Sequence, residues 1–340
     1  MMEFAGRSRF RSRLSRGTYE RVGVARPGVI AIVVAILLTS MPASAAPYPP
    51  RVQVFVANSG SNSVTVFDTR MGEVVGTIPV GATPVGVGAA PGGDRVYVTN
   101  EQADTVSVID PRPLAVVATV PVGRHPFGVT ATPRHAYVTN FSSNSVTVID
   151  VATNKPVRDI QVGRFPHTPA TNPDGSRVYV TNNGSQSVTV IDAAGQKPVA
   201  TIPVGRFPAG IAVSPDGKRV YVANTGSNSV TVIDARRNKP IATVPVGRAP
   251  IGVSVTPGGR VYVANARDDT VSVLDPSGDP TGPAVQVPKR PEGSAASPDD
   301  SFVYVTNNGA DSMSILDAVT AKLVGTVPVG SQPEGLVVTS

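Results

Sequence analysis

The sequence lacks several residue types on which common active sites depend. It has 340 residues and contains no cysteine and no tryptophan, so disulfides, thiolate metal sites and thiol nucleophiles are excluded. The three histidines, His125, His135 and His167, do not have the spacing of metal ligands. No Gly-x-Ser-x-Gly elbow or phosphate-binding glycine loop occurs. We therefore predict no metal, no cofactor and no catalytic residues.

What the chain has in abundance is valine, glycine and proline. Glycine and proline each occur 33 times, and hydrophobic residues make up 41% of the chain while aromatic residues make up 5%. This composition is typical of many short β strands separated by turns. It predicts an all-β protein.

The first 45 residues differ from the rest. A segment rich in arginine precedes ten apolar residues at 29–38, and a small-residue stretch that contains Ala43, Ser44 and Ala45 follows. This order is typical of a secretory signal peptide, so we predict cleavage after Ala45 and a protein that is secreted, periplasmic or associated with the cell envelope. The alternative is a retained anchor, although ten apolar residues are too few to span a bilayer.

The leader also accounts for most of the basic charge. It carries seven arginines against two glutamates, so without it the formal net charge falls from +6 to +1. The basic character is therefore a feature of targeting, and it does not by itself indicate nucleic-acid binding.

Residues 46–340 contain an internal repeat. An aromatic-Val-Thr/Ala-Asn tetrad recurs every 40 to 42 residues and ends at Asn58, Asn100, Asn140, Asn182, Asn224, Asn265 and Asn307. In one repeat, strands are expected at 209–213, 219–223, 229–233 and 240–246, with turn residues between them. Four strands in about 42 residues predict one blade of a β-propeller, and seven repeats predict seven blades of four antiparallel strands.

The two ends of this region predict how the ring closes. The first repeat begins with its second strand at 51–57, and the chain ends with a lone inner strand at 335–339. Pairing these segments would complete one blade and remove the exposed edges of an open array. We therefore expect residues 46–340 to form one closed propeller, and we expect the protein to be a monomer.

Four tetrads, which end at Asn100, Asn140, Asn182 and Asn307, read Tyr-Val-Thr-Asn. On these residues the chain resembles the YVTN-repeat β-propeller family over nearly all of residues 46–340. Phe55 replaces tyrosine in the first repeat, alanine replaces threonine in three repeats, and the turn at 132–134 is two residues short. The resemblance implies a seven-bladed propeller of surface or periplasmic proteins, and it does not imply one activity.

Polar residues that occur once in every repeat are interpreted as structural. An aspartate ends each third strand, at Asp68, Asp110, Asp150, Asp192, Asp234, Asp275 and Asp317. We expect these carboxylates to accept hydrogen bonds from the backbone of the turn that follows. The tetrad asparagines are interpreted in the same way.

Functional residues are expected where the repeats differ. The connection from the fourth strand to the next inner strand has the pattern Val-Gly-Arg-x-Pro and places a cation in five repeats, namely Arg124, Arg164, Arg206, Arg248 and Lys289. His125, Phe165 and Phe207 follow three of them. Cations beside exposed aromatic rings could bind an anionic ligand with flat groups, such as single-stranded nucleic acid. The alternative is that each arginine pairs with a neighbouring carboxylate or carbonyl.

The residue after the proline of each connection is expected at the rim of the central channel. These residues are Val85, Phe127, His167, Ala209, Ile251, Glu292 and Glu334. A site made from His167, Glu292 and Glu334 would resemble those of propeller lactonases and lyases, but His167 and Glu292 are three blades apart, which makes a shared metal ion difficult.

The function that this sequence favours is a non-enzymatic, extracytoplasmic binding scaffold. Its partner would be an anionic ligand, a nucleic acid, or a protein or peptide surface at the cationic channel mouth, with no membrane span after removal of the leader. The alternatives are a lactonase-like or lyase-like enzyme and a structural module for cell-surface adhesion.

Overall fold

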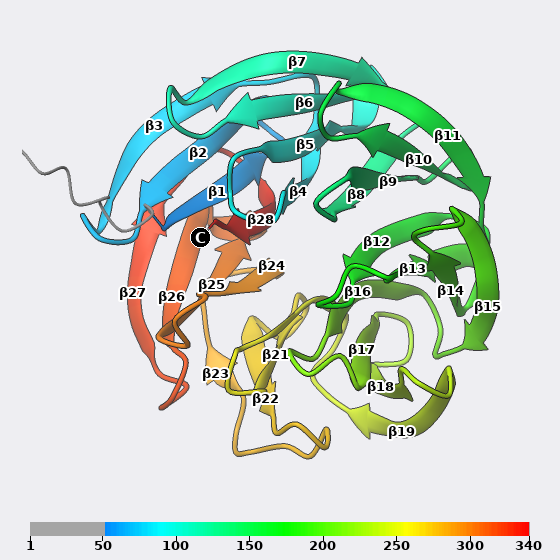
Figure 1. The fold of residues 1–340 in the computed structure, drawn as a ribbon. Coiled ribbons are helices and arrows are strands. Elements are labelled where there is room, and N and C mark those ends of the chain that lie inside the picture. The colour runs from blue at the N-terminus through cyan, green and yellow to red at the C-terminus, as the bar shows by residue number, and fades with distance from the viewer. Residues whose placement is uncertain (1–51, 340) are drawn as a thin grey trace, which may run out of the picture. The chain divides into compact units, whose positions relative to one another are not determined.

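Seven antiparallel sheets of four strands surround a central axis in the computed structural model, which describes residues 52–339 (Figure 1). The sequence therefore predicted the fold class correctly. The predicted leader and its cleavage site after Ala45 lie outside the described residues. We number the blades 1 to 7 along the chain, beginning with the blade that contains β1 (Gln53–Asn58).

The strands follow one order in every blade, from the axis outward. The inner strands are β4 (Pro84–Ala89), β8 (Pro126–Ala131), β12 (Pro166–Thr171), β16 (Pro208–Val213), β20 (Pro250–Val255), β24 (Pro291–Ala296) and β28 (Pro333–Val338). The second strands, after β1, are β5 (Val96–Asn100), β9 (His135–Asn140), β13 (Arg177–Asn182), β17 (Arg219–Asn224), β21 (Val261–Asn265) and β25 (Phe302–Asn307). The third strands are β2 (Ser63–Asp68), β6 (Thr105–Asp110), β10 (Ser145–Asp150), β14 (Ser187–Asp192), β18 (Ser229–Asp234), β22 (Thr270–Leu274) and β26 (Ser312–Asp317). The outer strands are β3 (Glu73–Pro79), β7 (Ala115–Pro121), β11 (Lys155–Gln161), β15 (Lys197–Pro203), β19 (Lys239–Pro245), β23 (Val285–Gln286) and β27 (Leu323–Pro328).

The C-terminal strand closes the ring as expected. β28 pairs antiparallel with β1, and Val54 lies opposite Val338. The inner strands then neighbour one another in a complete circle, because β28 also contacts β4 on one side and β24 on the other. The second and third strands are buried on both faces between adjacent blades, which explains their runs of valine.

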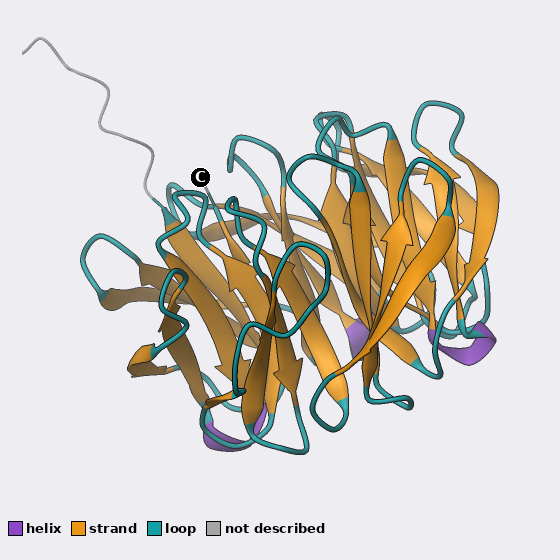
Figure 2. Cartoon of the chain, turned by 90° about the horizontal axis from the view of Figure 1, so that it is seen from below, coloured by secondary structure: helices purple, strands orange, loops and turns teal. Residues whose placement is uncertain are grey.

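The two faces of the propeller are different. The connections from outer to inner strands meet the loops that follow the second strands, as where the Gly184 backbone N–H donates to the Arg164 carbonyl at 3.0 Å. We call this side the mouth face. It also carries the short 3-10 helices η1 (Glu101–Ala103), η2 (Asn183–Ser185) and η3 (Asn308–Ala310), which appear at the lower edge of Figure 2, whereas the chain ends on the opposite face.

Each tetrad asparagine fastens its blade on the mouth face. Its side-chain amide donates to two hydroxyls of the third strand, and in blade 4 the Asn182 amide donates to Ser187 at 3.1 Å and to Thr189 at 2.9 Å. The Asn182 carbonyl oxygen accepts from the Gly163 backbone N–H at 3.1 Å. A Cβ at Gly163 would lie 2.5 Å from the Asn182 side chain, so only glycine fits there.

The tetrad threonine and tyrosine join one blade to the next. Thr181 donates to the Ala209 carbonyl of the next inner strand at 2.7 Å, and the Tyr221 hydroxyl donates to the Pro276 carbonyl of the next blade at 2.6 Å. The aspartates of the third strands cap the following turns, as predicted. Asp68 Oδ1, for example, accepts from the backbone N–H groups of Arg70 and Met71 at 3.0 Å each.

We predict that Asn182→Ala lowers the free energy of unfolding by about 2 to 3 kcal/mol, because it leaves the half-buried Gly163 N–H without an acceptor and removes two further hydrogen bonds, both buried. Urea denaturation measures this change. The matched control is Asn183→Ala, since the Asn183 side chain makes one long hydrogen bond, 3.4 Å to the Pro208 carbonyl. The free energy of unfolding of this variant should fall by less than about 0.5 kcal/mol. Equal losses in the two variants would contradict the fastening role.

Candidate functional site

The rim of the central channel is built by seven equivalent irregularities in the inner strands. In each one the pairing with the second strand shifts between the proline and the residue three positions later, as between Pro126 and Val129. Such a bulge changes the direction of a side chain. The residue after the proline thereby lines the channel in six blades, at Val85, Phe127, His167, Ile251, Glu292 and Glu334. In these six blades the residue after the proline therefore lies at the rim of the channel, where the sequence analysis placed it.

Glycines keep the channel narrow. A Cβ at Gly293 would lie 2.5 Å from the Glu334 carbonyl oxygen, and one at Gly335 would lie 2.6 Å from the Val85 carbonyl oxygen. The neighbouring inner strands therefore approach too closely for any larger residue. The cavity that remains at the axis has a volume of about 150 Å³.

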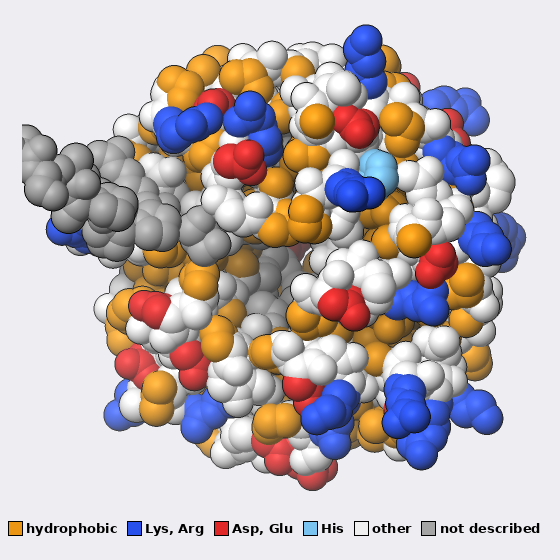
Figure 3. Space-filling model, in the orientation of Figure 1, with side chains coloured by type: hydrophobic (Ala, Val, Ile, Leu, Met, Phe, Trp, Pro, Cys, Tyr) orange, Lys and Arg blue, Asp and Glu red, His pale blue; other side chains and the backbone are white. Residues whose placement is uncertain are grey.

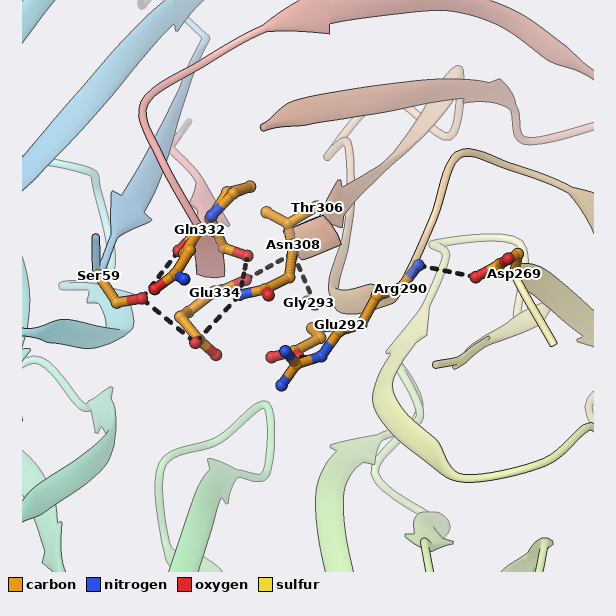
Figure 4. Close-up of polar contacts among 10 residues, drawn as sticks. Ser59, Asp269, Arg290, Glu292, Gly293, Thr306, Asn308, Gln332 and Glu334 are labelled. Carbon is orange, nitrogen blue, oxygen red and sulfur yellow. Dashed lines mark hydrogen bonds and ion pairs between the residues drawn. The ribbon is translucent and has the colours of Figure 1, made fainter. Parts of the chain in front are cut away.

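Two carboxyl groups lie side by side in this cavity, on the adjacent strands β24 and β28 (Figure 4). Glu292 is only 6% exposed, and its Oε1 lies 2.7 Å from Arg290 Nε in an ion pair that lacks hydrogen-bond geometry. Glu334 Oε1 accepts from Asn308 Nδ2 at 3.2 Å and from Ser59 Oγ at 3.4 Å.

Burial and the neighbouring Glu292 carboxyl raise the pKa of Glu334 to about 9. Glu334 therefore keeps its proton at neutral pH. Burial also raises the pKa of Glu101 on the same face, where His125 opposes the shift and Glu334 adds to it.

The wall opposite the carboxyl pair is apolar and neutral. Burial lowers the pKa of His167 to about 4, so its imidazole is uncharged at neutral pH. Its ring centroid lies 3.9 Å from that of Phe127, and its Nδ1 lies 3.0 Å from the Thr168 hydroxyl. His167 thus belongs to the channel wall and lies across the ring from the glutamates.

The five cations predicted as a ring are exposed on the mouth face, at Arg124, Arg164, Arg206, Arg248 and Lys289. In the described part of the chain, none of them lines the channel cavity. Three of these cations contact a neighbouring carboxylate or carbonyl, which is the alternative to ligand binding given in the sequence analysis. Arg164 and Arg206 donate to the carbonyls of Gly184 and Gly226 at 3.1 and 2.8 Å, and Arg248 pairs with Asp268 at 2.5 Å.

The aromatic residues beside these cations adopt the left-handed backbone conformation that the equivalent residue has in all seven connections. Phe165 and Phe207 have φ angles of 54° and 49°, which is rare for a bulky residue. Their side chains are 43% and 54% exposed and lie over Gly184 and Gly226, where a Cβ would collide with the ring. His125 has the same conformation, with φ 50°, and its Nδ1 lies 2.6 Å from the Ser142 hydroxyl.

We call Arg164, Phe165, Arg206 and Phe207 the arginine–phenylalanine arc. These two pairs lie in successive connections, and the Phe165 ring stacks on Phe141 with centroids 4.9 Å apart. The loops that surround the arc, at 161–166, 183–186, 203–208 and 225–228, contain no acidic residue. The arc is therefore positive, unlike the neighbouring Arg248, which Asp268 neutralises.

Sequence reasoning missed four residues at the mouth: Ser59, Phe141, Arg290 and Asn308. Ser59, Phe141 and Asn308 each follow a tetrad asparagine, and that position differs from repeat to repeat. Comparison of the repeats at this position would have found them. Arg290 occupies the position before the proline, while the aligned cation, Lys289, is one residue earlier.

Figure 3 shows the opposite face, apart from the area that the grey residues cover. Lys and Arg side chains are scattered near its edge among Asp and Glu, and the surface is hollowed at the axis. Within residues 52–339 the structure contains no helix with the length and apolar character of a membrane span. The same residues bring together no group of three His, Cys, Asp or Glu side chains that could hold a metal ion.

Comparison with known proteins supports the propeller architecture. A model of the family described as "Lactonase, 7-bladed beta-propeller" matches residues 192–282, about a quarter of the chain. A search of curated proteins finds no significant match. The resemblance to the YVTN-repeat family stays a prediction.

Three solved structures share the fold. Hydrazine synthase of Kuenenia stuttgartiensis is 25% identical with a TM-score of 0.72, over 78% of this chain and 92% of that chain. A functionally unknown protein from Desulfotomaculum acetoxidans is 19% identical, with a TM-score of 0.75 and coverages of 84% and 98%. A putative 6-phosphogluconolactonase from Bacteroides fragilis is 16% identical, with a TM-score of 0.73 and coverages of 86% and 99%. The last two likenesses concern the fold alone.

The raised pKa of Glu334 predicts a pH-dependent stability. An unfolded glutamate ionises near pH 4.3, whereas folded Glu334 keeps its proton to about pH 9. Between these values the unfolded state binds fewer protons, so stability falls as pH rises, by at most about 1.4 kcal/mol per unit. Glu334→Gln removes this pH-dependent contribution to the free energy of unfolding. Urea denaturation at pH 5, 6, 7 and 8 should show the variant gaining stability relative to the wild type as pH rises, and parallel curves would contradict the assignment.

Proposed function

We propose that this protein is an extracytoplasmic binding protein that recognises an anionic partner through the arginine–phenylalanine arc. The observation that carries the proposal is the pair of exposed Arg–Phe units in successive connections, surrounded by loops without acidic residues. Extracytoplasmic action rests on the predicted leader.

The geometry of the arc suits an anion that carries flat groups. The two guanidinium groups are held by backbone carbonyls, which fixes their positions while leaving their charge unneutralised. Arginine binds phosphate through planar, paired hydrogen bonds, and exposed phenylalanine rings stack on bases. Single-stranded nucleic acid combines both features and is the first ligand to test.

The backbone of Phe165 and Phe207 is left-handed, but so is that of the equivalent residue in all seven connections, from Thr83 to Gln332. This conformation therefore belongs to the repeat and does not mark a site. It is held by the loop of the preceding blade, as where the Phe165 N–H donates to Asn144 Oδ1 at 2.9 Å. The connections before β12 and β16 differ from the others in having an exposed phenylalanine at this position.

We predict that a fluorescent oligothymidylate binds the protein with a dissociation constant that rises steeply with salt. The double variant Arg164→Ala/Arg206→Ala should bind about tenfold or more weakly, with a salt slope lower by about 2. Fluorescence anisotropy at several salt concentrations measures both changes.

The matched control is Lys155→Ala/Lys197→Ala, which removes two exposed positive charges at the starts of β11 and β15. It should bind as the wild type does. Equal weakening in both double variants would mean that net charge, and not the arc, causes binding. Binding of a polyglutamate peptide but not of the oligonucleotide would identify an acidic protein surface as the partner, and binding of neither probe would favour a structural adhesion module.

A second candidate function is lactone hydrolysis, which the family match over residues 192–282 favours. Glu334, which keeps its proton, and Glu292, which pairs with Arg290, could divide the roles of general acid and general base. Acid release from glucono-δ-lactone in a pH-stat tests it. The enzyme hypothesis predicts release above the uncatalysed rate, lost in Glu334→Gln and kept in Glu73→Gln, whose side chain is exposed on β3. An uncatalysed rate with the wild type would reject it for this substrate.

A further inference from the structure

The carboxyl pair at the channel mouth consists of two acidic groups that face one cationic partner within the described residues. The ion pair to Glu292 comes from Arg290 at 2.7 Å, whereas Glu334 accepts hydrogen bonds from two neutral groups, Asn308 and Ser59. One guanidinium therefore faces two carboxyls. Buried carboxylates without a counter-charge are strongly unfavourable.

The other ionisable groups near the pair do not supply a second positive charge. Glu101 faces Glu334 from η1 and would add negative charge, while His125 lies beside Glu101 and opposes it. His167, across the cavity, is neutral at physiological pH. Arg290 is itself fixed by its backbone, whose N–H donates to Asp269 Oδ1 at 2.8 Å (Figure 4).

A buried acceptor atom also points to a missing partner. Glu292 Oε1 is inaccessible to solvent and receives no hydrogen bond within the described residues, although Arg290 lies close to it. Buried polar atoms in folded proteins nearly always have a hydrogen-bond partner. Glu292 therefore has an unused acceptor, and Glu334 stays neutral because it is buried and no second cation of the described chain faces it.

We propose that the channel mouth binds a small organic cation, a protonated primary amine whose ammonium group lies between Glu292 and Glu334. An ammonium group supplies the positive charge and up to three hydrogen-bond donors. The remaining wall of the cavity, with Val85, Phe127 and Ile251, would pack against the alkyl body, and the face of the Phe127 ring attracts cations.

The size of the cavity limits the ligand. A volume of about 150 Å³ is comparable with that of an engineered cavity that binds benzene, so an amine with about five or six heavy atoms fits. A divalent metal is a poorer match, because Ca²⁺ takes six to eight oxygen ligands and Mg²⁺ requires octahedral coordination. The site differs from the arginine–phenylalanine arc in residues, blades and charge.

Binding of the cation would release a proton. Glu334 holds a proton when no cation occupies the cavity, and the ammonium replaces that proton, which passes to the buffer. Affinity should therefore rise with pH between about 6 and 8, by up to about tenfold per unit, while the amine stays protonated, since such amines ionise near pH 10.

Isothermal titration calorimetry with n-butylammonium chloride tests this proposal on the purified protein. We expect saturable binding at pH 7 and 8, release of up to one proton, detected from the difference between buffers of unequal ionisation enthalpy, and at least tenfold weaker binding of the neutral analogue n-butanol. Binding of n-butanol with equal affinity, binding without proton release, or no binding of n-butylammonium at pH 8 would overturn the proposal.

Substitution of the two channel glutamates tests whether n-butylammonium binds between them. Glu334→Gln and Glu292→Gln should each weaken n-butylammonium binding at least tenfold, and Glu334→Gln should abolish proton release. Glu73→Gln removes the same charge from an exposed position on β3 and should leave binding unchanged; an equal loss in Glu73→Gln would contradict the assignment. If either channel variant fails to fold, the proton release and the n-butanol comparison with the wild type decide the question. Arg164→Ala/Arg206→Ala should retain n-butylammonium binding, so the two proposed sites can fail independently.

Discussion

The close approach of neighbouring inner strands at the axis determines most of what this propeller can do. Glycines such as Gly293 and Gly335 lie against the carbonyl groups of the next inner strand, where a Cβ has no room. Thr306 adds a hydrogen bond across the same boundary, donating to the Glu334 carbonyl at 2.5 Å. These contacts bring the strands together and leave a cavity of about 150 Å³ at the axis.

The narrow axis in turn controls the chemistry of the residues that line it. Ionisable side chains at the rim have little access to water, so the neutral form is favoured for His167 and for Glu334. The same residue types on an outer strand would titrate at ordinary values. The seven bulges of the inner strands therefore convert one variable position per repeat into a ring of side chains in a low-polarity environment.

The fold could be predicted from the sequence because its determinants are local and repeated. The tetrad, the aspartate at the end of the third strand and the lone final strand specify blade number, turn capping and ring closure without any knowledge of distances between blades. Blade 6 is the exception, because β23 has only two residues, in a repeat whose outer segment departs from the pattern of the others.

The properties of the candidate sites could be predicted only in part. The rim position was identified correctly because it has a fixed offset from the connection proline. The protonation of Glu334 was not foreseen, since it depends on Glu292, which is 42 residues away in sequence and on the adjacent inner strand. Likewise, the sequence aligned Lys289 with the arginines, whereas the cation that reaches the channel carboxyls is Arg290.

Differences between repeats thus divide the mouth face into two regions of different chemistry. The connections before β12 and β16 carry Arg164 and Arg206 among loops without acidic residues, and the sector formed by β24, β28 and their neighbouring loops carries Glu292, Glu334 and Asp269. Every blade contains the same fastening asparagine and capping aspartate, so these residues cannot distinguish one sector from another. Selectivity for a ligand must therefore come from the connection and rim positions, where a substitution changes one sector and leaves the hydrogen bonds that hold the ring together intact.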